Sequence, residues 1–195
     1  MKTLLSLLAI MNTSSVGTTV VNDVINVDNI ENFAQEPHEI LIEEPLYYIE
    51  AKNNVGDWRS YSVKSNLGNI NPSDFNTIIF NGPSHISVEK SGEDLGDFKA
   101  FDNISPNSYK NKLINKKITS WDELISSNAV ELSHLEFGTP KSKLIVDINL
   151  TYTYYQEKDG SWTFEMWIRM EMEKIWGQHA RVELYTPKTI TLMEL

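Results

Sequence analysis

The sequence predicts a mainly β fold of the α+β class, built as an antiparallel sheet or sandwich with a C-terminal three-stranded meander and one or two short helices. Two observations lead to this prediction. Apolar and polar residues alternate over two long segments of the C-terminal third, and short β-like runs alternate with turn residues before them. The chain of 195 residues, 41% of them hydrophobic, is large enough for one domain with its own core.

Four short runs rich in β-branched and aromatic residues predict strands in the first half of the domain. Clusters of Asn, Gly, Pro and Ser separate them, as expected for turns. The runs are Leu46–Lys52, Trp58–Lys64, Thr77–Asn81 and His85–Lys90.

One helix is predicted near residues 120–127, because Ser120 and Glu123 have the spacing of a capping box. In that motif the serine hydroxyl accepts from the backbone N–H of Glu123, and the Glu123 side chain reaches back to the start of the helix. A second, shorter helix is predicted around residues 108–116.

The clearest pattern in the chain lies in its C-terminal third. Apolar side chains occupy the even positions of two segments, while the odd positions carry mostly Thr, Asn, Asp, Glu and Arg. A period of two over this length indicates strands with one buried face. The even residues are Leu144, Val146, Ile148, Leu150, Tyr152 and Tyr154, then Trp162, Phe164, Met166, Ile168, Met170 and Met172.

These two segments are predicted to form a hairpin around the turn residues Lys158–Gly160. Placing Tyr154 opposite Trp162 brings all the apolar residues to one shared face. The same register sets two oppositely charged pairs across the strands, Arg169 with Asp147 and Glu173 with Lys143.

A third strand is predicted after Gly177-Gln178, a plausible two-residue turn. Its apolar residues, Ala180 to Leu184, face inward if the second strand has a β-bulge near Lys174. Pro187 has no N–H to donate to a ladder, so this strand is predicted to be an edge strand or to end there. The three strands form the predicted meander.

Residues 1–22 predict an export signal. Lys2 is a short charged region, and Thr3–Met11 is an apolar run far shorter than the ~20 residues of a transmembrane helix. Ser15-Val16-Gly17 places small residues before a potential cut, although a buried N-terminal helix is the alternative. Residues 23–44 are acidic and are predicted to be a solvated lead-in, which leaves 45–195 as a single β-rich domain.

The first 21 residues, MKTLLSLLAIMNTSSVGTTVV, resemble the leaders of spiroplasma and other mollicute surface lipoproteins of the spiralin type. Those leaders have a similar Lys-Leu-Leu-Ser-Leu-Leu start and a Val-Gly-Thr-Thr stretch, followed by Val-Val-Ala-Cys with a lipidated cysteine. Here Asn22 and Asp23 follow Val20-Val21, so that cysteine is missing. The resemblance implies a mollicute-like origin and a secreted or cell-surface location, and it does not extend to lipid anchoring.

Composition narrows the classes of function. The formal net charge of −10 opposes binding to nucleic acid or to anionic membranes. The absence of cysteine excludes disulfides, thiolate nucleophiles and cysteine-bound zinc. No phosphate-binding, dinucleotide-binding or nucleophile-elbow motif occurs, and the four histidines are scattered, so no catalytic residue, cofactor or metal is predicted.

The polar face of the predicted meander is the candidate binding site. It carries Trp167, Arg169, Tyr185 and Tyr155, which belong to residue types that dominate binding interfaces. The predicted register places Arg169 between Asp147 and Tyr185. Alternatively, another layer of the same domain covers Trp167.

These observations predict a non-catalytic, secreted or cell-surface binding protein, such as an adhesin or envelope component, with a protein or glycan partner. The alternative is a pore-forming or membrane-inserting protein, because each long segment exceeds the roughly 9–11 residues of a tilted transmembrane strand. An exported hydrolase with residues gathered from distant positions is a third reading.

Overall fold

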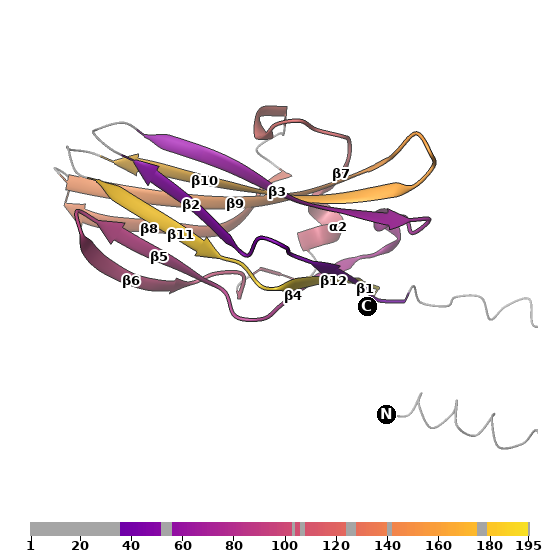
Figure 1. Ribbon diagram of the computed structural model, residues 1–195, viewed down its shortest axis with the longest axis horizontal. Helices are drawn as coiled ribbons and strands as arrows, with labels where there is room; N and C mark the ends of the chain where they lie inside the picture. Colours follow the sequence, from indigo (N-terminus) through magenta and orange to yellow (C-terminus); the bar gives the residue numbers. More distant parts are fainter. Residues whose placement is uncertain are drawn as a thin grey trace, which may run out of the picture. The chain divides into compact units, whose positions relative to one another are not determined.

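The computed structural model describes residues 36–51, 56–102, 104–105, 108–123, 128–139, 142–174 and 179–194. The predicted export signal at 1–22 and the predicted turn at 177–178 lie outside these residues. Within them the protein is mainly β, with antiparallel sheets arranged as a sandwich, which confirms the coarse fold prediction (Figure 1). None of the helices in these ranges is long and apolar enough to cross a membrane.

One layer of the sandwich is a five-stranded sheet built on two long central strands. These strands, β9 and β10, form the predicted hairpin, and β3 flanks β10 as the edge strand. The other side of β9 is shared by β8, which is antiparallel, and by the short parallel strand β7. The bounds are β3 Asp57–Gly68, β7 Leu113–Asn115, β8 Val130–Thr139, β9 Ser142–Gln156 and β10 Trp162–Lys174.

The second layer consists of two smaller antiparallel sheets. The four-stranded sheet has the order β2-β11-β5-β6, and the three-stranded sheet has the order β1-β12-β4. The bounds are β1 His38–Leu41, β2 Leu46–Ala51, β4 Thr77–Asn81, β5 His85–Lys90, β6 Glu93–Lys99, β11 Ala180–Tyr185 and β12 Thr189–Met193.

The two smaller sheets share the same three stretches of chain. β1 continues into β2, β4 into β5, and β11 into β12. In both sheets the β11–β12 stretch lies between the other two, so the three stretches have the same order in each sheet. Each stretch is interrupted beside a proline, Pro45, Pro83 or Pro187, which cannot donate to a ladder. Backbone hydrogen bonds still join the stretches at the break, including Thr186 N–H to the Pro45 carbonyl at 2.8 Å.

The core fills the space between the layers. The predicted even faces of β9 and β10 point into it, and Leu144 to Tyr152 and Phe164 to Met172 are fully buried at these positions. The opposite layer contributes Ile49, Val88, Val182 and their neighbours to the same cluster. The prediction of one shared apolar face is therefore confirmed.

A single helical turn anchors the end of the sandwich beside the three-stranded sheet. In Figure 1, helix α2 (Ser108–Lys112) lies between that sheet and the five-stranded sheet. Its Tyr109 is fully buried, with ring centroids 5.6 Å from Tyr152 and 6.0 Å from Phe164. The Tyr109 hydroxyl donates to the carbonyl of Pro72, at the start of the 3₁₀ turn Pro72–Asp74, over 2.8 Å.

The predicted meander is wrong. β11 is the third strand of the prediction, but it pairs with β2 and β5 in the other layer, and not with β10. It ends at Tyr185, shortly before Pro187, as predicted, yet it is a central strand of its sheet and not an edge strand.

The hairpin register differs by two residues from the predicted one. Phe164, and not Trp162, is opposite Tyr154, so Arg169 lies opposite Asn149. The predicted charge pairs are therefore absent, and Lys143 instead contacts Glu136 at 2.7 Å. The shared face survives because a shift of two residues preserves which side each residue faces.

The turn explains the shift. The Glu157 N–H donates to the Ser161 carbonyl over 2.8 Å, and the Gly160 N–H donates back to the Glu157 carbonyl over 3.0 Å. Residues 158–160 therefore form a three-residue hairpin loop. Loops of this length usually have a glycine with positive φ after a tight turn, and Gly160 has a φ of 89°. Asp159 accepts from the Ser161 N–H at 3.0 Å and fixes the loop.

Two other expectations need correction. The region of the predicted helix 120–127 contains the 3₁₀ turn Trp121–Glu123, while residues 124–127 lie outside the described ranges. Glu123 reaches back to the N–H of Thr119, at 2.9 Å, and not to Ser120. Residues 23–35 of the predicted solvated lead-in lie outside the described ranges, and its remaining part contains β1, whose Ile40 is buried and which pairs with β12.

Candidate functional site

The side chain that led the sequence-based site prediction is covered. Trp167 points away from the main core, on the outer side of the five-stranded sheet, where it packs with Ile118 and Trp121 in a small separate cluster. Only 8% of its surface is exposed. The alternative in which another part of the domain covers Trp167 is the one observed.

The other predicted residues are divided between the two layers. Arg169 is on the outer side of the five-stranded sheet, 4.7 Å from the centre of the exposed Trp58 ring and 3.0 Å from Glu171. Tyr155 is buried on that side, beneath Lys64 and Lys117. Tyr185 is on β11 in the other layer, so the structure does not bring it next to Arg169.

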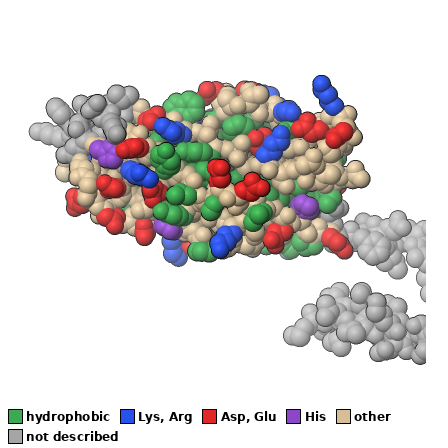
Figure 2. Space-filling view, viewed as in Figure 1, with side chains coloured by type: hydrophobic (Ala, Val, Ile, Leu, Met, Phe, Trp, Pro, Cys, Tyr) green, Lys and Arg blue, Asp and Glu red, His purple; other side chains and the backbone are tan. Residues whose placement is uncertain are grey.

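Tyr185 belongs to an open surface that the sequence prediction missed. This surface, here called the outer face, is the side of the four-stranded sheet that points away from the core. Figure 2 shows hydrophobic, acidic and basic side chains intermixed on the side of the molecule seen there. Cross-strand register defines the outer face as three rows, which are Leu46, Tyr185, His85 and Lys99; Tyr48, Glu183, Ser87 and Asp97; and Glu50, Arg181, Glu89 and Asp94.

Glu183 organises the centre of the outer face. Its carboxylate is 2.6 Å from the Arg181 guanidinium on one side and accepts from the Tyr185 hydroxyl at 2.8 Å on the other. These three residues alternate along β11, so all three side chains project from the same side of the strand. The Tyr185 hydroxyl and the Arg181 charge hold the pKa of Glu183 below its ordinary value, which keeps this carboxylate ionised.

Aromatic rings flank this central group. The His85 and Tyr185 rings are stacked, with centroids 4.2 Å apart. Tyr48 lies on the other side, where the Arg181 guanidinium is 5.1 Å from its ring centre and Arg59 is 5.9 Å away. Tyr48 nevertheless remains 42% exposed, which leaves part of its ring available to a partner.

A shallow hollow lies beside the central group. It has a volume of about 190 Å³ and is lined by Ser87, Glu89, Arg181 and Glu183. Its hydroxyl, carboxylate and guanidinium groups can both donate and accept hydrogen bonds. The arrangement therefore combines a flat aromatic surface with fixed polar groups, and it suits recognition of a partner.

Sequence reasoning missed most of this surface for a specific reason. Tyr48 and Arg181 each belong to a predicted strand and face outward by alternation, which was a usable signal. Their proximity depends on β2 pairing with β11, strands from opposite ends of the domain. No pattern within either strand encodes that pairing.

A separate charged group lies on the outer side of β8 and β9. His134 Nδ1 is 2.5 Å from an Asp147 carboxylate oxygen, and its Nε2 is 3.4 Å from Glu136. The hydrogen bond and charge of Asp147, aided by Glu136, raise the pKa of His134.

We expect the raised pKa of His134 to be visible by NMR titration as a midpoint above the ~6.5 of an unperturbed histidine. Because the folded-state pKa is the higher one, this pair stabilises the fold fully below about pH 6.5, and the contribution is lost as pH rises through the folded-state value. Asp147→Asn should lower the midpoint towards the unperturbed value. A midpoint that does not move would contradict the assignment to Asp147.

Within the described ranges, no three or more His, Asp or Glu side chains are grouped so that they could hold a metal ion. A scan of the chain against protein-family models found no match, and searches of curated proteins and of solved structures found none either.

Proposed function

We propose that the protein is a non-catalytic, secreted or cell-surface binding protein that engages a protein or glycan partner through the outer face. The observation that carries the proposal is the pair of the exposed Tyr48 and the half-buried Arg181, held beside Glu183 and Tyr185 on the four-stranded sheet. Tyrosine and arginine supply much of the energy of protein recognition surfaces. The leader-like first 21 residues support the location.

The preorganisation of the outer face supports binding over catalysis. Arg181, Glu183 and Tyr185 are fixed by contacts with one another, so a partner meets side chains that lose little conformational freedom. The surface is shallow, whereas sites for small-molecule ligands and substrates are usually concave pockets. Acidic residues outnumber basic ones in the three rows, which favours neutral or cationic partners.

The proposal predicts that the double variant Tyr48→Ala/Arg181→Ala binds its partner at least about tenfold more weakly than the native chain. Binding of fluorescently labelled full-length protein to a glycan array and to cultured cells would measure the change. The expected cause is loss of the exposed ring together with the guanidinium that lies over it.

Lys110→Ala is the matched control, because Lys110 is an exposed cation on α2, at the other end of the sandwich. It should bind as the native chain does, and both variants should unfold at nearly the native temperature. Equal binding by the double variant would refute the outer face as the site. Dye release from lipid vesicles, without binding to glycans or cells, would refute the binding function and favour membrane insertion.

A further inference from the structure

The long strand β3 leaves one edge of the five-stranded sheet open. Among the described strands it pairs only with β10, although it runs for 12 residues. An edge strand of this length presents a row of backbone donors and acceptors that can pair with another extended chain. Natural sheets usually shorten or cover such an edge, so its surroundings decide whether it is accessible.

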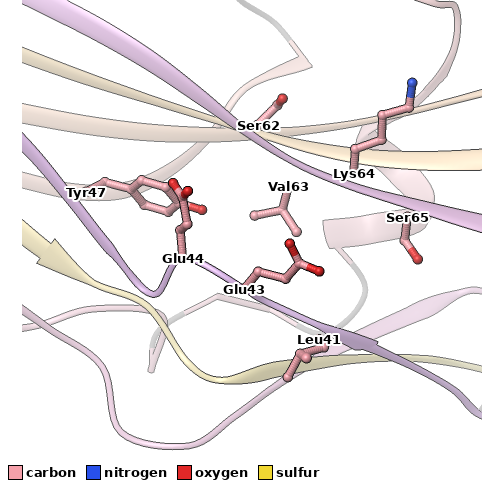
Figure 3. Close-up of a pocket in the computed structure, with 8 residues that line it drawn as sticks. All are labelled: Leu41, Glu43, Glu44, Tyr47, Ser62, Val63, Lys64 and Ser65. Atoms are coloured by element: carbon pink, nitrogen blue, oxygen red, sulfur yellow. The ribbon is translucent and has the colours of Figure 1, made fainter.

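Among the described residues, the break in the opposite layer leaves part of this edge, Ser62–Ser65, facing a cleft. At Tyr61, directly before Ser62, the layers meet, because the Tyr61 ring packs on Tyr47 with centroids 4.6 Å apart. Further along, the segment between β1 and β2 bends away beside Pro45, and a cleft of about 470 Å³ separates it from Ser62–Ser65 of β3. Figure 3 shows this cleft with its lining side chains.

On the side of β3 that faces the opposite layer, the lining of the cleft combines apolar and acidic groups. Leu41 is 65% exposed at the rim, and Val63 forms the wall on β3. The carboxylates of Glu43 and Glu44 point towards the space between the layers, whereas the Lys64 amine points away from it (Figure 3). The cleft therefore carries local negative charge next to apolar surface.

We propose that this cleft receives an extended segment of a partner protein, which adds to β3 as a further strand of the five-stranded sheet. Side chains of an added strand alternate between the two sides of the sheet. Those on the inner side would meet Leu41 and Val63 or the carboxylates of Glu43 and Glu44, so the partner carries apolar and basic residues there. Those on the outer side would lie beside Ser62 and are small and polar.

The test uses a labelled eight-residue peptide of the pattern Thr-Val-Thr-Lys-Thr-Val-Thr-Lys and the full-length protein. Fluorescence polarisation should show saturable binding, and the amide signals of β3 should shift in NMR spectra. Two control peptides separate the causes of binding. N-methylation of alternate amides should abolish binding by removing the ladder donors, and replacing lysine by glutamate should weaken it about tenfold.

The protein variant Glu43→Gln/Glu44→Gln should also bind the lysine peptide about tenfold more weakly. Glu93→Gln/Glu131→Gln is its matched control, with the same change of charge at exposed sites on β6 and β8, and it should bind normally. Equal affinity for the N-methylated peptide, or shifts confined to other strands, would overturn the proposal. None of these residues belongs to the central group of the outer face, so failure here leaves the proposed function standing.

Discussion

Tyr109→Ala is expected to lower the free energy of unfolding by about 4 kcal/mol, the range found for removing a buried aromatic ring. Tyr109 is fully buried and is the only buried residue of its five-residue helix. Its ring fills the space beside Tyr152 and Phe164, so truncation leaves a cavity at the end of the sandwich. Chemical denaturation would measure the loss, together with a fall in Tm of about 10 °C.

Tyr109→Phe separates the ring from its hydroxyl. This variant keeps the packing and loses only the 2.8 Å hydrogen bond to the Pro72 carbonyl, so a loss of about 1 kcal/mol is expected. If Tyr109→Ala and Tyr109→Phe lowered the free energy of unfolding by the same amount, the hydroxyl and not the ring would provide the stabilisation. That result would contradict the packing argument.

Gly138→Ala is expected to destabilise the protein by about 3 kcal/mol, because two penalties combine at this position. Gly138 has a φ of 95°, a conformation that residues with a side chain rarely adopt. In addition, an added Cβ would lie 2.0 Å from the Ser142 carbonyl oxygen of β9, so the β8–β9 pairing must shift. Thermal and chemical unfolding of the variant would measure the effect.

Gly92→Ala provides the comparison. Gly92 also has a positive φ, 81°, but an added Cβ would meet nothing within 4 Å. Gly92→Ala is therefore expected to lower the free energy of unfolding by only about 1 kcal/mol, the cost of the unfavourable backbone conformation. A similar loss in both variants would show that the close approach to Ser142 is relieved without cost.

Local patterns in the sequence predict the strands and their buried faces well. β4 and β5 have the predicted bounds, and the even residues of β9 and β10 are the centre of the core. The reason is that alternation is imposed by burial, which acts on each strand separately. Register depends on the conformation of the turn at Gly160, and charge pairing was too weak a guide to it.

Partner choice between strands was not predictable in the same way. β11 follows β10 in sequence, and a hairpin between them agrees with the local patterns once a β-bulge near Lys174 is assumed. The chain instead crosses to the other layer, where Ala180, Val182 and Leu184 complete the opposite side of the core. Which strands β11 pairs with depends on how all the strands of the domain are paired, so the sequence of one segment does not determine it.

The candidate site was predictable only in its residue types. Tyrosine and arginine at outward positions, the residue types of the prediction, also make up part of the outer face, and Tyr185 belongs to that surface. Trp167 was misleading because a large ring on an outward position is also what a covering segment needs, and Ile118 and Trp121 supply that segment. Outward alternation identifies the side of a sheet and does not show whether that side is open.

The pairing of β1 with β12 has a consequence for the order in which the protein acquires its structure. The first described strand finds its partner almost at the C-terminus, and β2 and β3 likewise pair with β11 and β10. A nascent chain therefore lacks the partners of its first three described strands until β10, β11 and β12 have been synthesised, and such distant pairings form slowly. The two layers of the sandwich can therefore be completed only after these late strands are present, whereas local hairpins such as β5–β6 and β8–β9 need no distant partner.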